Sequence, residues 1–482
     1  MLEKIFNLKA NNTSIKKEFL AGITTFITMS YIIFVNPQMM AQSGMDYGAS
    51  FVGTCIAASL ACFFMGIYAN WPVGLAPGMG LNAFFTYTVV GGMGYSWEIA
   101  LGAVFWSGIL FVIMSITPLR KWMLEGIPLN LRIAMGSGVG LFIGLIGLKN
   151  GGIISGNEST LLSLGDLNQF SVLLSILGFL IISILSIRKI SGSIIIGIFT
   201  ITSIAVVTGL EEFTGIVSFP PDPLPVFMKL DLIGAFDVAM ISVIISFLFV
   251  NFFDTTGTLL GMANRAKLVK NSGEIQNLDK AIKADSTSSV FGSFFGCAPV
   301  TSYVESSAGI EIGGRTGLTA VFTGSAFLVS IFLSPLSEMV PPYATAGVLI
   351  YVAILMLSDV ERLNWSDSSE IIPSLIIIIM IPLTFSIANG IALGFITYTI
   401  IKLASNKHKE ISSSAWFLTL IFLAKFIFLK KMTTLYHYPL CPFSRKIRLF
   451  LGEQKIGADL IIERFWENRK EFIKLNPSGE FL

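Results

Sequence analysis

Long apolar segments recur along this chain, and they constrain its fold more than any other feature of the sequence. A helix needs about 20 mainly apolar residues to cross a bilayer. Seven such segments precede a loop rich in proline and acids at 211–231: 19–37, 50–70, 73–90, 97–117, 131–148, 169–187 and 191–209. Seven more follow: 236–259, 281–297, 299–313, 317–335, 343–358, 371–387 and 389–403. We therefore expect an all-α polytopic membrane protein with about fourteen transmembrane helices.

The composition supports a membrane protein and argues against several other classes. Charged residues make up 13% of the chain, whereas soluble domains average about 25%. A net charge of +2 gives no reason to expect nucleic acid as a partner. The four cysteines lack metal-binding spacing, so the sequence predicts no metal site. We also expect no cofactor and no catalytic residue.

Positive charges in the loops predict the orientation, because cytoplasmic loops carry an excess of Lys and Arg. With the N-terminus inside, the basic stretches at 120–132, 188–189, 265–283 and 402–409 all fall on the cytoplasmic side. The predicted outer loops at 38–49, 91–96 and 336–342 contain no Lys or Arg. We expect a multi-pass protein of the inner or plasma membrane with a cytoplasmic N-terminus.

An odd number of spans in each half places the two halves in opposite orientations, which is an inverted repeat. Phe34-Val35-Asn36 recurs as 249–251, and Ala76-Pro77 recurs as 298–299. We expect one repeat at 1–235, a second at 236–404, an extra hydrophobic segment and linker at 405–431, and a separate fragment at 432–482.

The third and tenth segments are poor helices, because both contain proline and several glycines. Non-helical backbone in a membrane occurs where protein or a water-filled cavity covers it. Broken segments at corresponding places in two repeats are the best sequence indication of a substrate site. Asn82 lies in the third segment and can donate to and accept from a planar solute.

Two acids lie inside predicted spans, Asp254 late in the eighth and Glu305 in the tenth. A charge within the bilayer is costly, so each should face a cavity or a partner. One acid could bind N–H groups of the solute while the other takes a coupling proton. Thr258 lies one helical turn after Asp254, where packing or a bond to the helix backbone competes with substrate contact.

Three further polar residues have structural interpretations. Asn36 and Asn251 occupy corresponding positions in the two halves, which predicts a pair of symmetric hydrogen bonders. Asp285 follows a basic loop, and we interpret it as a charge partner at a helix end.

At these residues the sequence resembles the adenine–guanine–hypoxanthine permeases, a branch of the nucleobase:cation symporter-2 (nucleobase–ascorbate transporter) family. The matching segments span about residues 1–430 and include AGITTFITMSYIIFVNPQ, GLAPGMGLNAFF, FFDTTGTLLG, TSYVESSAGIEIGGRTGLTAVFTG and PLTFSIANGIALGFI.

The resemblance implies a 7+7 inverted repeat divided into core and gate domains, with antiparallel strands in the third and tenth spans. It also implies import of guanine, hypoxanthine or adenine by proton symport, and relatives of this kind are often homodimers. The implied substrate-binding residues are Asp254, Glu305, Asn82 and the backbone around Tyr303 and Val304, with Glu305 and Asp254 also implied in proton coupling. Thr258 is a further candidate for substrate binding, from its place on the helix face of Asp254. The preferred purine, the acid that carries the proton and the oligomeric state stay open.

The C-terminal part differs in character. Residues 412–429 are apolar, and whether they cross the membrane stays open. From Met432 the sequence MTTLYHYPLCPFSRKIRLFLGEQKI resembles the first strand and helix of a glutathione S-transferase, a thioredoxin-like α/β fold. The remaining chain is short for that fold, so we expect a truncated fragment in which Cys441 is inert.

Two other functions compete with purine symport. An anion transporter of the sulfate or bicarbonate type would share the general fold, although Glu305 would repel an oxyanion. A membrane-tethered glutathione-dependent enzyme would require turnover that depends on Cys441.

Overall fold

The computed structural model describes residues 2–157, 159–269, 274–428, 433–453 and 458–467. The chain divides into two compact units, Met1–Phe422 and Leu423–Leu482. The expected boundary at 431–432 lies outside the described residues. All the predicted site residues lie in the first unit.

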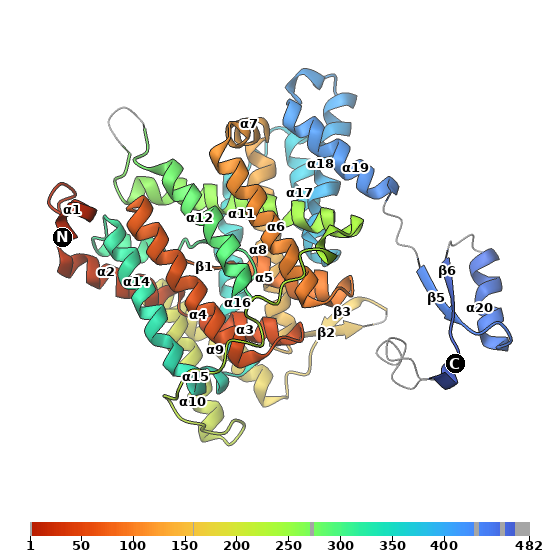
Figure 1. The fold of residues 1–482 in the computed structure, drawn as a ribbon, viewed down its shortest axis with the longest axis horizontal. Coiled ribbons are helices and arrows are strands. Elements are labelled where there is room, and N and C mark those ends of the chain that lie inside the picture. Colours follow the sequence, from red (N-terminus) through yellow and green to blue (C-terminus); the bar gives the residue numbers. More distant parts are fainter. Residues whose placement is uncertain (1, 158, 270–273, 429–432, 454–457, 468–482) are drawn as a thin grey trace. The chain divides into compact units, whose positions relative to one another are not determined.

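The first unit is built almost entirely of helices, and the predicted apolar segments correspond to its elements (Figure 1). The helices before the long loop are α1 (Leu2–Phe6), α2 (Ile15–Met29), α3 (Ile32–Gln42), α4 (Tyr47–Phe64), α6 (Trp97–Ile116), α7 (Leu119–Gly126), α8 (Leu129–Asn150), α9 (Phe170–Ile187) and α10 (Ser193–Val207). Those after it are α11 (Val238–Arg265), α12 (Leu278–Phe294), α14 (Gly317–Val329), α15 (Ser334–Glu338), α16 (Pro342–Leu357), α17 (Ser368–Leu383) and α18 (Ile387–Ala404).

Among the described residues, nine helical stretches have the length and apolar composition that a membrane crossing requires. Three shorter apolar helices lie at Ser193–Val207, Ser368–Leu383 and Ser413–Ala424. Their apolar side chains point both inward and outward, as in a helix bundle surrounded by lipid. The chain is therefore a multi-pass membrane protein.

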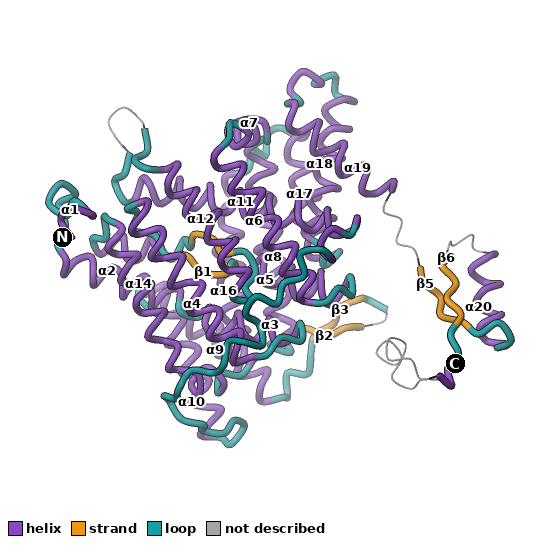
Figure 2. Tube along the Cα trace, in the orientation of Figure 1, coloured by secondary structure: helices purple, strands orange, loops and turns teal. Residues whose placement is uncertain are grey.

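The third and tenth segments are broken, as their proline and glycine content predicted, and each begins with a short strand, as the family resemblance implied. Figure 2 shows the first of these strands, β1. Strands β1 (Leu75–Pro77) and β4 (Val300–Ser302) pair antiparallel, with Ala76 opposite Thr301. Gly78 N–H donates to Pro299 O, and Tyr303 N–H donates to Gly74 O, both at 3.0 Å. These bonds satisfy backbone groups that a broken helix would leave unpaired.

A short helix continues each strand. β1 leads into α5 (Met79–Ala83) and the π-helix η2 (Phe84–Gly92), and β4 leads into α13 (Ser306–Ile312). The fully buried strands therefore hold the starts of two helices beside each other in the interior.

The helices pack in two groups. Around the strand pair lie α2, α3, α4, α6, α11, α12, α13 and α14, while α8, α9, α10, α16, α17 and α18 form the second group. Glycines of α8 allow close packing in the second group: a Cβ at Gly140 would meet Met356 Cβ at 2.6 Å, and one at Gly147 would meet Leu349 Cβ at 2.8 Å. Helix α5 contacts α8 and so brings the strand region against the second group.

The remaining elements lie at the periphery and in the tail. A hairpin of β2 (Ile154–Asn157) and β3 (Leu161–Leu164) follows α8. Helix α19 (Ser413–Phe428) forms where an extra apolar segment was expected, and Thr419 in it lies 2.8 Å from Thr399 of α18, hydroxyl to hydroxyl. In the second unit, β5 (Thr433–His437) pairs parallel with β6 (Ala458–Ile462), and α20 (Pro442–Glu453) connects them.

Candidate functional site

Glu305 lies between β4 and the first turn of α13, where the chain leaves the strand pair. Its side chain is half-buried, and its Oε1 accepts a hydrogen bond of 2.6 Å from the hydroxyl of Tyr31. Thr28 donates to the backbone oxygen of Glu305 at 3.3 Å. Tyr31 lies at the break between α2 and α3, so the first apolar segment positions the carboxyl group of the tenth.

Asp254 approaches the same strand from α11. The Thr301 hydroxyl of β4 donates to Asp254 Oδ2 at 3.3 Å, and it lies 3.2 Å from the hydroxyl of Thr255. The Asp254 side chain is half-buried. Thr301 links it to the strand that ends just before Glu305. The structure thus brings the two acids predicted from the sequence to one short strand.

Our interpretation of Asp285 as a charge partner at a helix end is wrong. Asp285 is fully buried in the middle of α12. Its two oxygens accept hydrogen bonds of 2.6 Å, one from Thr255 and one from Ser302. The basic loop precedes Asp285 in sequence, but the rotation of α12 turns the carboxyl group toward β4. A chain of hydroxyl groups therefore connects Asp285 to Asp254 through Thr255 and Thr301.

Asn82 lies in α5, the helix that follows β1, whereas Glu305 follows β4. It is fully buried, yet neither its amide nitrogen nor its amide oxygen has a hydrogen-bond partner among the described residues. An unsatisfied buried amide costs about 1–3 kcal/mol. Such a group is suited to a polar partner that the polypeptide itself does not supply.

The other three predicted contacts differ in their surroundings. Tyr303 is buried, and its hydroxyl donates to Pro77 O at 2.6 Å, which ties the end of β4 to β1. Val304 has 48% of its surface exposed, next to Glu305. Thr258 is buried in α11 one turn beyond Asp254. The structure thus places Tyr303 and Val304 directly after β4, and Thr258 one turn beyond Asp254 in α11.

Asn36 and Asn251 form the symmetric structural pair that was predicted. Asn36 Nδ2 donates to Thr54 of α4 at 2.7 Å, and Asn251 Nδ2 donates to Ser289 of α12 at 2.8 Å. Each bond joins a helix to the next helix of its half. Both side chains are buried and hold the scaffold around the strands.

Glu18 is another buried acid, but its environment explains it fully. Its carboxylate accepts hydrogen bonds from the backbone N–H groups of Arg315, Thr316 and Thr319, and from the Thr319 hydroxyl at 2.6 Å. These groups surround the start of α14, where free N–H groups favour an anion. Glu18 therefore caps α14.

The three acids near β4 have different surroundings from Glu18. Within the described residues, no Lys or Arg forms an ion pair with Asp254, Asp285 or Glu305, which bond to hydroxyl groups instead. A carboxyl group in this setting can accept N–H donors of a ligand, or it can carry a proton and remain neutral.

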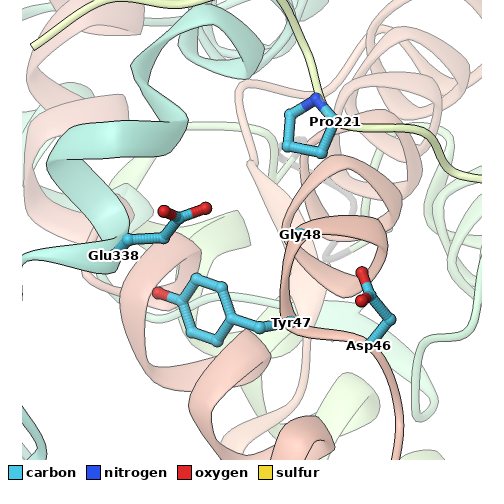
Figure 3. Close-up of a pocket in the computed structure, with 5 residues that line it drawn as sticks. All are labelled: Asp46, Tyr47, Gly48, Pro221 and Glu338. Atoms are coloured by element: carbon cyan, nitrogen blue, oxygen red, sulfur yellow. The ribbon is translucent and has the colours of Figure 1, made fainter. Parts of the chain in front are cut away.

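A separate cavity of about 450 Å³ is lined by Asp46, Tyr47, Gly48, Pro221 and Glu338 (Figure 3). Its walls come from the start of α4, the end of α15 and the long loop, with Tyr47 between the carboxylates of Asp46 and Glu338 (Figure 3). Asp46 caps α4 by accepting from Ala49 N–H at 2.7 Å. This cavity therefore does not include any of the predicted site residues.

The fold and the site together define a class. Two discontinuous segments meet inside a multi-pass membrane protein, with unneutralised acids beside them, and this is the arrangement of a secondary transporter. Residues 16–393 match the permease family. The chain belongs to this family.

Relatives of known name agree with that assignment. The chain is 47% identical to the adenine permease AdeP of Escherichia coli, over 89% of this chain and 96% of that protein. It is 43% identical to the guanine/hypoxanthine permease PbuO of Bacillus subtilis, over 84% and 96%.

Among solved structures, the fold resembles the transmembrane domain of the cyanobacterial bicarbonate transporter BicA, with a TM-score of 0.56 and 14% identity over 81% of this chain and 97% of that one. It also resembles SLC26A9, with a TM-score of 0.57 and 12% identity over 84% and 68%.

Proposed function

We propose that this protein imports purine nucleobases (adenine, guanine or hypoxanthine) by proton symport through alternating access. Relatives that cover nearly the whole membrane part are named for these bases. The observation that carries the proposal is the position of Asp254 and Glu305, which are half-buried beside the paired strands β1 and β4. Neither acid has a basic partner among the described residues. Acids in this setting suit a solute with N–H donors and a coupling proton.

In the proposed site, Asp254, Glu305 and Asn82 contact the edge of the base. The amide of Asn82 has both a donor and an acceptor free for a ligand. Tyr303 and Val304 line the site through their backbone, and Thr258 completes it on α11. One of the two acids binds N–H groups of the base while the other carries the proton.

The proposed architecture is fourteen spans in two inverted repeats, at 1–235 and 236–404. The corresponding bonds of Asn36 and Asn251 support the repeat, as do strands at matching places in the two halves. The group around the strands corresponds to the core domain, and the α8–α16–α17 group corresponds to the gate. Relative movement of these groups would open the site alternately to the two sides.

The proposed topology has a cytoplasmic N-terminus in the inner or plasma membrane. The distribution of Lys and Arg among the loops supports this orientation. The family resemblance adds homodimerisation, which light scattering of the detergent-solubilised protein would test.

For residues 432–482 we propose a glutathione-transferase-like segment that takes no part in transport. The parallel β5–α20–β6 order supports a thioredoxin-like start. Cys441 lies directly before α20, and hydrogen bonds from the backbone N–H and the hydroxyl of Ser444 lower the pKa of its thiol. If the fragment is inert, Cys441→Ser leaves transport unchanged.

Uptake of radiolabelled hypoxanthine, guanine, adenine, uracil and sulfate in a host that lacks purine transport tests the function. We expect saturable uptake of at least one purine, abolished by a protonophore, and no uptake of uracil or sulfate. Sulfate uptake without purine uptake would favour the anion transporter instead. Stopping the chain before Met432 provides the control for interference by the tail.

A further inference from the structure

An apolar groove of about 750 Å³ opens on the outside of the first unit, between the end of α4 and helix α12. Its aromatic and aliphatic lining comes from α4, from the π-helix η1 (Met65–Ala69) and from α12: Leu60, Phe63, Phe64, Ile67, Tyr68 and Phe291. Leu60, Ile67 and Phe291 each have more than 40% of their surface exposed. The groove is therefore open to the surroundings of the protein along its length.

The residues that line the groove lie along two neighbouring helices. From Leu60 to Tyr68 it follows α4 and η1 for about 12 Å, at about 1.5 Å per residue. The rings of Phe64 and Tyr68 are stacked, with centroids 5.1 Å apart, and form a flat wall. An apolar lining along the helix axis, with an aromatic wall, suits an acyl chain.

One end of the groove is polar and positively charged. Lys280 Nζ lies 5.9 Å above the ring of Tyr68. At the same end Asn277 donates to Ala69 O at 3.2 Å, and the Trp71 indole donates to Gln276 O at 2.9 Å. The stretch α4–η1 ends there and α12 begins there, and a basic residue at the ends of apolar helices is typical of the polar edge of a membrane.

We propose that this groove binds an anionic phospholipid of the surrounding membrane, with an acyl chain against the aromatic wall and the phosphate at Lys280. The loop at 265–283 is the most basic connection of the chain, and the loop charges assign it to the cytoplasmic side, where a bilayer carries anionic lipid. The charge at one end and the apolar wall at the other together match a headgroup joined to a chain. A free phosphate would use only the first of these features.

The test uses the purified full chain in nanodiscs of phosphatidylcholine containing increasing fractions of phosphatidylglycerol. Lipids that remain bound are counted by native mass spectrometry, and thermal unfolding is followed in parallel. The variants are Lys280→Gln, which removes the charge, and Leu60→Trp, which fills the groove. Lys121→Gln is the matched control, because Lys121 is an exposed lysine on α7 that pairs with Glu125.

We expect the wild type to retain phosphatidylglycerol over phosphatidylcholine by about fivefold, the effect of one lysine near a membrane surface. Lys280→Gln should remove the preference but keep a bound chain, Leu60→Trp should remove both, and Lys121→Gln should change neither. Equal retention of the two lipids by the wild type would overturn the proposal. So would a preference that survives in Lys280→Gln, or stabilisation by inorganic phosphate equal to that by the lipid.

Discussion

The two broken segments of this protein have the same geometry and different chemistry. β1–α5 and β4–α13 both place a short strand before a helix, and their strands pair with each other. The first carries the neutral Asn82, which has no polar partner among the described residues. The second carries Glu305, which accepts a hydrogen bond from Tyr31, and Thr301, which reaches Asp254.

The backbone pairing that both segments share holds the structure together, whereas the side chains in which they differ bear on function. The paired strands β1 and β4 satisfy each other's backbone groups. The acids and the hydroxyl groups bonded to them are instead associated with the β4–α13 segment. We infer that the tenth segment carries charge and coupling, while the third contributes neutral recognition. Substitutions on the two segments should therefore differ in kind and not only in size.

The largest effect is expected for Glu305→Gln, which keeps the shape but removes the charge and the exchangeable proton. A hydrogen bond to a charged group contributes about 1.5–3 kcal/mol, so base affinity should fall by about 10- to 100-fold. Accumulation against a gradient should be lost completely, as radiolabelled purine uptake would measure.

Glu311→Gln is the matched control for this change. Glu311 lies in α13, the helix that directly follows Glu305, is exposed and pairs with Arg265 at 3.5 Å. Its substitution should leave uptake within about twofold of the wild type, because exposed ion pairs contribute little. An equal loss in both variants would show that any change in α13 disrupts transport and would remove the special role of Glu305.

A loss of transport of about tenfold is expected for Asp285→Asn, because one acceptor for Thr255 or Ser302 becomes a donor and the chain of hydroxyl groups to Asp254 is disturbed. Asp279→Asn, in the same helix but exposed, should have no such effect. Uptake per molecule of membrane-inserted protein measures both. Normal transport by Asp285→Asn would confine the coupling chemistry to Asp254 and Glu305.

Tyr31→Phe should reduce transport by about five- to tenfold, because Glu305 loses a donor while the ring keeps its packing. The comparison is Tyr303→Phe, which removes a bond to Pro77 O and should lower the unfolding temperature more than it changes proton dependence. The pH profile of uptake distinguishes them: we expect a shift for Tyr31→Phe alone. Identical profiles would make Tyr31 a packing residue.

The smallest effect is expected for Asn82→Ala. Among the described residues Asn82 has no side-chain hydrogen bond to lose, so the unfolding temperature should stay constant, while base affinity falls by about two- to tenfold. Asn36→Ala should do the reverse, because it breaks the bond to Thr54. Binding measured by calorimetry and unfolding measured by fluorescence separate the two, and a destabilised Asn82→Ala with unchanged affinity would contradict neutral recognition.

The sequence predicted the position of the site through residues that are rare in a membrane. Proline in the third and tenth segments indicated the breaks, and acids in apolar segments indicated Asp254 and Glu305. These signals work because a bilayer tolerates neither free backbone groups nor unpaired charges without a reason.

Other parts of the site could not be found in this way. Tyr31 and Glu305 are 274 positions apart, and a tyrosine in the middle of an apolar segment looks like a packing residue. Thr301 and Thr255 resemble ordinary threonines of a buried segment. Asp285 was misinterpreted because its neighbours in sequence are basic, whereas its neighbours in space are hydroxyl groups of other elements.

The most direct test of the account measures proton movement with base movement. The purified full chain in proteoliposomes with a trapped pH-sensitive dye would receive hypoxanthine, guanine or adenine from outside. We predict saturable acidification of the interior with the transported purine for the wild type and none for Glu305→Gln. Purine entry without acidification, or equal acidification by Glu305→Gln, would contradict proton symport through the acids at the strand crossing.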